Sequence, residues 1–139
     1  MRILLYIVIL LLLFMAPVQR LDVAELQPVQ TVAVSVQSGQ VMIETDTGQQ
    51  GSGETVADAV DKMEKATPGV IYLDTAQYLL ITEDALFCAE ELCPYLRSST
   101  KVCLWDGKSS VNGAALYLRV RTDLTPFHQW KTDAKKLEN

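Results

Sequence analysis

Alternating apolar and polar positions predict a β-hairpin over residues 31–46. Val32, Val34 and Val36 alternate with smaller or polar residues, and the alternation resumes after Ser38-Gly39. A two-residue turn there pairs Gln37 with Gln40, Val36 with Val41, Val34 with Ile43 and Val32 with Thr45. A slip of one residue would turn the valines to water, so the apolar pattern and the turn favour the same register.

An apolar stripe with helical spacing predicts an amphipathic helix over residues 56–66. The stripe consists of Val56, Ala59, Val60 and Met63. Thr55 is placed to cap the start of this helix. Its polar face holds two favourable i,i+4 ion pairs, Asp58 with Lys62 and Asp61 with Lys65. Thr67-Pro68-Gly69 ends the helix, because proline disfavours helical geometry in the residue before it.

Further apolar runs predict two more strands and a second helix. Residues 78–81 are apolar on both faces, which is typical of a strand inside a sheet, and residues 101–105 indicate another strand followed by an Asp106-Gly107 turn. The second helix is predicted over residues 83–93, and four of its residues are expected to face inward: Leu86, Ala89, Leu92 and Cys93. Residues 70–73 and 114–121 are apolar, but periodicity does not decide between strand and helix there.

These elements together predict an α+β fold. A small mixed β-sheet, made of the N-terminal hairpin and a β-α-β unit with parallel outer strands, is packed by two amphipathic helices and preceded by an N-terminal apolar helix. Residues 1–20 are expected to be a signal peptide or membrane anchor, residues 21–107 one α/β domain, and residues 108–139 a C-terminal extension whose structure the pattern leaves open.

The leader is the longest apolar run of the chain. Residues 3–18 carry no charge or side-chain amide, and only Arg2 and the terminal amine precede them. A helix of this length spans about 24 Å, which is short of the ~30 Å hydrocarbon core and suits a signal peptide. Signal-peptide cleavage requires small residues just before the cut, and the sequence around Ala16-Pro17 lacks such a site. This favours an uncleaved anchor. Either way, we expect the rest of the chain on the extracytoplasmic face, membrane-anchored or, as the alternative, secreted.

Charge is divided along the chain. Residues 44–93 hold eleven acidic and two basic side chains, net −9, whereas residues 94–139 hold four acidic and eight basic, net +4. The acidic middle disfavours nucleic acid as a partner, since phosphates require a basic surface. The basic end is typical of a solvated tail, with contact to an anionic membrane or partner as the alternative.

Cysteine and histidine give no predicted site. Three cysteines, Cys88, Cys93 and Cys103, leave at least one unpaired, and the C-x4-C spacing matches no standard zinc knuckle. The only histidine, His128, lies in a polar end. No serine or cysteine has an evident base beside it, so we predict no catalytic, cofactor-binding or metal-binding residues and no enzymatic activity.

The glycine-rich segment over residues 48–55 superficially resembles a phosphate-binding loop. Glu54 stands where that loop requires lysine, which inverts the electrostatics and argues against a nucleotide site. We therefore expect a flexible connector that ends in the Thr55 cap. The segment does leave one alternative open, a secreted small-ligand-binding protein or hydrolase on a generic α/β scaffold.

Several stretches in order resemble the N-terminal domain of Ger(x)C spore-germination proteins, the C subunits of nutrient germinant receptors. The matching stretches are Arg20-Leu21-Asp22 with Glu25-Leu26, Val32 to Val36, Gly53 to Ala59, Leu73 to Ile81, Tyr95-Leu96-Arg97 and Lys101 to Leu104. The resemblance covers about residues 20–107. Relatives carry a lipid-anchored cysteine directly after the leader and continue into further domains; this chain has no cysteine before Cys88.

The resemblance implies a non-enzymatic subunit that acts by protein contact. It implies integral-membrane germinant receptor subunits as partners, attachment to the membrane, and a place at the spore inner membrane. It supplies no catalytic residues and no cofactor. Because this chain has no cysteine directly after the leader, the apolar leader itself would hold the domain at the membrane.

Overall fold

The structure is a computed structural model that describes residues 2–15, 26–120 and 123–137. Its helices are α1 (Arg2–Met15), α2 (Val56–Ala66), α3 (Val111–Leu118) and α4 (Phe127–Leu137), with short 3-10 helices η2 (Leu73–Thr75) and η3 (Glu83–Ala89). Its strands are β1 (Leu26–Pro28), β2 (Thr31–Gln37), β3 (Gln40–Thr45), β4 (Gln50–Gly53), β5 (Val70–Tyr72), β6 (Tyr78–Ile81), β7 (Lys101–Leu104) and β8 (Thr125–Pro126).

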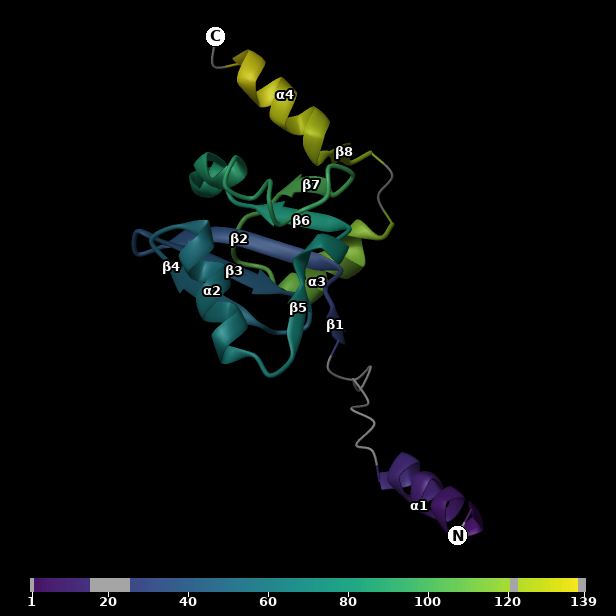
Figure 1. The fold of residues 1–139 in the computed structure, drawn as a ribbon. Helices are drawn as coiled ribbons and strands as arrows, with labels where there is room; N and C mark the ends of the chain where they lie inside the picture. The colour runs from purple at the N-terminus through teal and green to yellow at the C-terminus, as the bar shows by residue number, and fades with distance from the viewer. Residues whose placement is uncertain (1, 16–25, 121–122, 138–139) are drawn as a thin grey trace.

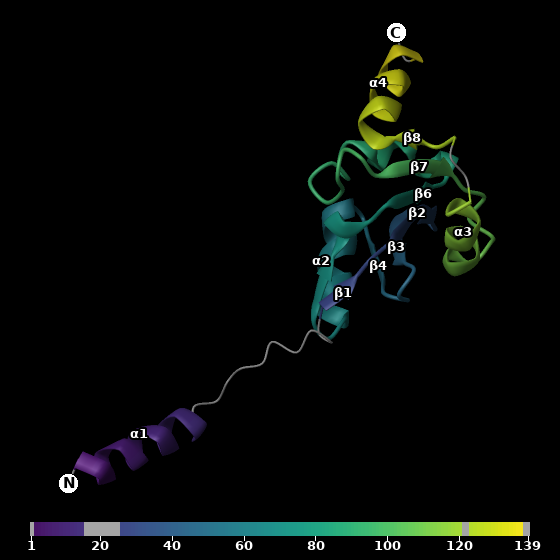
Figure 2. The same cartoon turned by 90° about the vertical axis from the view of Figure 1, so that its right-hand side faces the viewer.

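Six strands form one mixed sheet in the order β4-β3-β2-β6-β7-β8. β2, β6 and β7 are parallel neighbours, and the pairs at both ends of the sheet are antiparallel. β1 and β5 pair in parallel as a separate two-stranded sheet. The mixed sheet confirms the predicted α+β class, with α2 on one face and α3 on the other (Figures 1 and 2).

The hairpin register is confirmed pair by pair. Val36 lies opposite Val41, Val34 opposite Ile43 and Val32 opposite Thr45. The turn residues Ser38 and Gly39 have φ of 52° and 78°, the left-handed geometry that a tight hairpin turn requires. Local alternation and turn chemistry are therefore sufficient to define this part of the fold.

Helix α2 is also confirmed, with the four stripe residues buried. The Thr55 hydroxyl accepts a hydrogen bond from the Asp58 amide at 3.2 Å, and Lys65 pairs with Asp61 at 2.6 Å. The chain then returns to the middle of the sheet, because β6 lies beside β2 and runs parallel to it. The predicted β-α-β unit and the interior position of residues 78–81 are thus both observed.

The glycine-rich segment was predicted as a flexible connector, and this was wrong. Residues 50–53 form strand β4, which pairs with β3 and lies under α2. A Cβ on Gly51 would stand 2.0 Å from the Ala59 carbonyl oxygen, and one on Gly53 would stand 2.4 Å from the Asp58 Cβ. The two glycines therefore allow the helix to approach the strand, a role that sequence periodicity does not reveal.

The second predicted helix is a 3-10 helix from Glu83 to Ala89, followed by turns. Ala89 and Leu92 are buried as expected, but Leu86 is 39% exposed and Cys93 only partly buried. The tighter 3-10 repeat rotates successive side chains by 120°, which moves Leu86 off the face that an α-helix would bury.

The core lies on both faces of the sheet. On the face of α2, side chains of β2, β3 and β6 pack with α2, η3 and Phe127. On the opposite face, Ala33 and Leu80 pack against Val111 and Leu118 of α3. The sequence left strand or helix open for residues 114–121; the first five of these belong to α3, a helix that covers the second face. Residues 70–72 are strand β5.

Helix α1 stands apart from the other elements in both views (Figures 1 and 2). Its side chains from Ile3 to Ile9, and Leu11, are exposed. Among the described helices, none has both the length and the apolarity needed to cross a membrane.

Candidate functional site

An open cleft of about 610 Å³ lies at the carboxyl ends of β2, β6 and β7. Its lining residues follow the three strands: Ser35, Val36 and Gln37 from β2, Thr82, Glu83 and Asp84 after β6, and Leu104, Trp105, Asp106 and Gly107 after β7. The chain leaves β6 along the face of α2, whereas it leaves β7 toward α3 on the opposite face. Ligand sites of open α/β sheets occur where successive connections diverge in this way.

Carboxylates supply most of the charge in this cleft. Thr82 donates a hydrogen bond to the Asp84 carboxylate, and Glu83 and Asp84 are exposed. The Asp106 carboxylate accepts bonds from the Lys108 amide at 3.0 Å, the Ser109 amide at 3.3 Å and the Ser109 hydroxyl at 3.0 Å. These donors, led by the Lys108 amide, lower the pKa of Asp106 and keep it ionised.

Trp105 forms one wall of the cleft. Its indole N–H donates to the Ser109 hydroxyl at 2.9 Å, so the same loop that holds Asp106 also orients the ring. The cleft is therefore acidic and partly aromatic, a combination that suits a cationic or polar neutral group and repels phosphate.

The only histidine lies at the other end of β7. His128 Nδ1 is 3.0 Å from the Ser98 carbonyl oxygen, just before the strand begins. The cleft carboxylates lie after the strand ends, so imidazole and carboxylates do not share a site. The cleft carboxylates are therefore not paired with this imidazole.

The start of α2 does not offer an anion site. The Val56 amide donates to the Glu91 carboxylate at 3.1 Å, and the Asp58 amide is taken by the Thr55 hydroxyl. A carboxylate of the chain itself therefore occupies the position that a bound phosphate would take. The alternative function loses the glycine-rich motif on which it was based.

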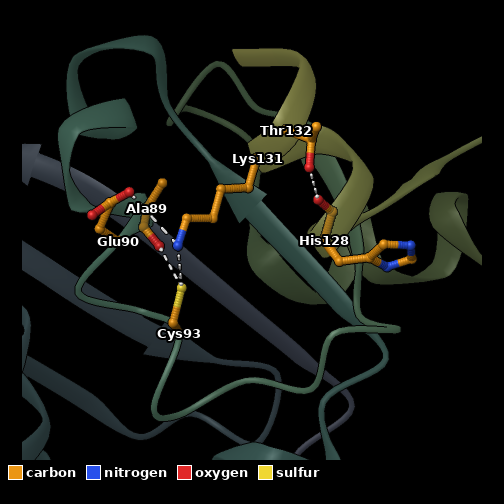
Figure 3. A network of polar contacts seen from close by, with 6 residues as sticks. All are labelled: Ala89, Glu90, Cys93, His128, Lys131 and Thr132. Atoms are coloured by element: carbon orange, nitrogen blue, oxygen red, sulfur yellow. Dashed lines mark hydrogen bonds and ion pairs between the residues drawn. The ribbon is translucent and has the colours of Figure 1, made fainter. Parts of the chain in front are cut away.

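Two cysteines have contrasting surroundings. Cys88 is buried, and burial, followed by the charges of Glu91 and Asp84, raises the pKa of its thiol to about 11. Cys93 accepts a hydrogen bond from Lys131 Nζ at 3.2 Å and its thiol lies 3.6 Å from the Ala89 carbonyl oxygen (Figure 3). Cys88, Cys93 and Cys103, all within the described residues, form no disulfide. Within the described ranges, no three His, Cys, Asp or Glu side chains are grouped to hold a metal ion.

Lys131 joins α4 to the segment after η3. Besides Cys93 it pairs with Glu90 at 3.6 Å, and Figure 3 shows its side chain reaching from the helix between these two residues. The hydrogen bond to Cys93, with help from the Glu90 charge, raises the pKa of Lys131. The contact links α4 to the segment after η3.

Exposed apolar side chains gather on α1 and at the end of α3. At the end of α3, Leu116 and Tyr117 of the helix and Val120 in the turn after it are 65%, 64% and 82% exposed. Sequence reasoning missed both the cleft and this apolar surface; Thr82-Glu83-Asp84 and Asp106-Gly107 directly after strands, and the run from Ala114 to Val120, were the available indications.

Comparison of the chain with protein-family models, with curated proteins and with solved structures finds no match.

Proposed function

We propose that this protein is a non-enzymatic, membrane-associated accessory domain that acts by protein contact at the extracytoplasmic face. The observation that carries the proposal is α1, a helix whose exposed side chains are apolar and which stands apart from the folded sheet (Figure 1). An apolar helix of this kind needs a non-aqueous environment, and a membrane supplies one.

The biological setting that we propose is spore germination. The ordered resemblance of residues 20–107 to Ger(x)C proteins supports it, and integral-membrane germinant receptor subunits are the proposed partners. Cleavage of the leader, which would give a secreted form, is the alternative for localisation.

The membrane part of the proposal is tested by flotation of the full chain with phospholipid vesicles. We expect the Leu5→Glu/Ile9→Glu double variant, which places two charges on α1, to abolish flotation. Phe87→Glu is the matched control, because Phe87 is an exposed apolar residue of the folded domain. Flotation that survives the α1 substitutions would refute attachment through α1. Mass spectrometry of the mature N-terminus distinguishes the anchored from the cleaved form.

The germination part is tested in the organism that carries the protein. We expect the protein in the spore inner-membrane fraction and slower nutrient germination after its deletion. Absence from that fraction together with unchanged germination kinetics would refute this setting.

The cleft supports a second candidate function, binding of a small cationic or polar ligand. Its position at the carboxyl ends of three parallel strands is the specific observation in favour. Thermal-shift measurements with amino acids, amines and sugars test it, with Asp84→Asn expected to remove any stabilisation. Asp74→Asn, an exposed carboxylate outside the cleft, is the control. No stabilisation by any ligand would leave this candidate without support.

A further inference from the structure

We propose that the surface formed by Leu116 and Tyr117 of α3 and by Val120, in the turn after the helix, lies against the bilayer to which α1 attaches the chain. The inference rests on the proposed membrane association and deepens it. It names a second surface in contact with the bilayer, and so an orientation of the domain.

Helix α3 is apolar on both sides, which an ordinary surface helix is not. Its inner side places Val111, Ala115 and Leu118 against the sheet, where all three are buried. Its outer side adds the exposed Leu116 and Tyr117, and the exposed Val120 follows in the turn after the helix. An exposed cluster of this kind marks an interaction surface.

The position of α3 brings this face close to the attached end of the domain. Arg119, directly after the helix, donates a hydrogen bond to the Gln30 side chain, which stands between β1 and β2 where the chain enters the sheet. Ten residues, 16–25, separate α1 from β1, and a chain of this length spans at most about 35 Å. The end of α3 is therefore within reach of a membrane that holds α1.

The charge distribution favours the same orientation. The acidic residues of α2, Asp58, Asp61 and Glu64, lie on the opposite face of the sheet from α3 (Figure 2). With α3 toward the bilayer, the acidic helix α2 points away from anionic headgroups (Figure 2), and Arg119, directly after α3, lies on the side that faces them. Tyr117 adds an aromatic ring with a hydroxyl, the type of side chain enriched at the headgroup level.

Depth-sensitive fluorescence quenching tests the proposal on the full chain. Tyr117→Trp and, as control, Phe87→Trp are reconstituted into vesicles of phosphatidylglycerol and brominated phosphatidylcholine. Phe87 is 66% exposed on η3, which packs on the α2 side of the sheet. The fluorescence of the parent chain, which holds Trp105 and Trp130, is subtracted. We expect brominated lipid to quench the tryptophan at position 117 at least about threefold more strongly than the tryptophan at position 87.

Equal quenching at the two positions, or none at either, would overturn the proposal. A blue-shifted emission at position 117 in the absence of vesicles would also overturn it, since protein would then cover this face, either α1 or a second copy of the chain. If the parent chain does not float with vesicles, both the proposed membrane association and this inference are refuted. Flotation without selective quenching refutes the inference alone.

Discussion

Gly51 of β4 lies directly under Ala59 of α2, so close that a Cβ at position 51 would stand 2.0 Å from the Ala59 carbonyl oxygen and 2.7 Å from the Met63 Cβ. The helix backbone thus rests on the strand without an intervening side chain. This contact explains the glycine-rich segment as a packing device.

Gly51→Ala should destabilise the protein strongly. The added methyl group meets helix backbone, which cannot rotate away, so we expect the free energy of unfolding to fall by about 2–3 kcal/mol. Urea unfolding measures the loss. Ser52→Ala is the matched control, because Ser52 belongs to the same strand and its side chain is directed to the other face. A Gly51→Ala variant as stable as Ser52→Ala would contradict the close approach.

Thr55→Ala should weaken α2 at its start. It removes the acceptor for the Asp58 amide, a capping bond that contributes about 1 kcal/mol. Thr55→Ser keeps the hydroxyl and should retain most of that contribution. Thermal unfolding of the two variants side by side provides the measurement, and equal losses would show that the hydroxyl does not cap the helix.

Phe127→Ala should reveal that residues beyond 107 belong to the folded unit. Phe127 is 3% exposed and stacks on Trp130, with 6.1 Å between ring centroids. Loss of a buried phenylalanine costs about 3–4 kcal/mol. Phe87→Ala makes the same substitution at an exposed position and should cost less than about 1 kcal/mol. Similar denaturation midpoints for the two variants would mean that α4 does not contribute to the core.

Cys88 should make stability fall at alkaline pH. Its folded pKa of about 11 lies above the ordinary value of 9.0, so the folded state retains a proton that the unfolded state releases. This stabilisation is complete below pH 9 and is lost as pH rises through 11; two pKa units correspond to about 3 kcal/mol. We expect Cys88→Ala to have a smaller pH dependence of its unfolding free energy over this window. An unchanged slope would contradict the assignment, whatever the stability of the variant at pH 7.

The raised pKa of Cys88 also illustrates that the surroundings of a side chain depend on tertiary packing. Glu91 and Asp84, three and four positions away in the chain, contribute to the raised pKa of Cys88, but its largest cause is burial, which is produced by packing of η3 against the sheet and α2. Likewise, the cleft forms only because β2, β6 and β7 bring three separate loops to one edge. Their polar residues were visible in the sequence, but their proximity was not.

The sequence by itself determined the hairpin and α2, because alternation, the Ser38-Gly39 turn and the Thr55 cap act between residues that are neighbours along the chain. Tertiary structure decided the conformation of β4, η3 and α3. Strand β4 has glycines at the two positions where an alternating strand pattern would show apolar side chains. It is a strand because it pairs with β3, and its glycines leave room for α2. The 3-10 helix η3 and the helix α3 are short, and their conformation depends on which face of the sheet they cover.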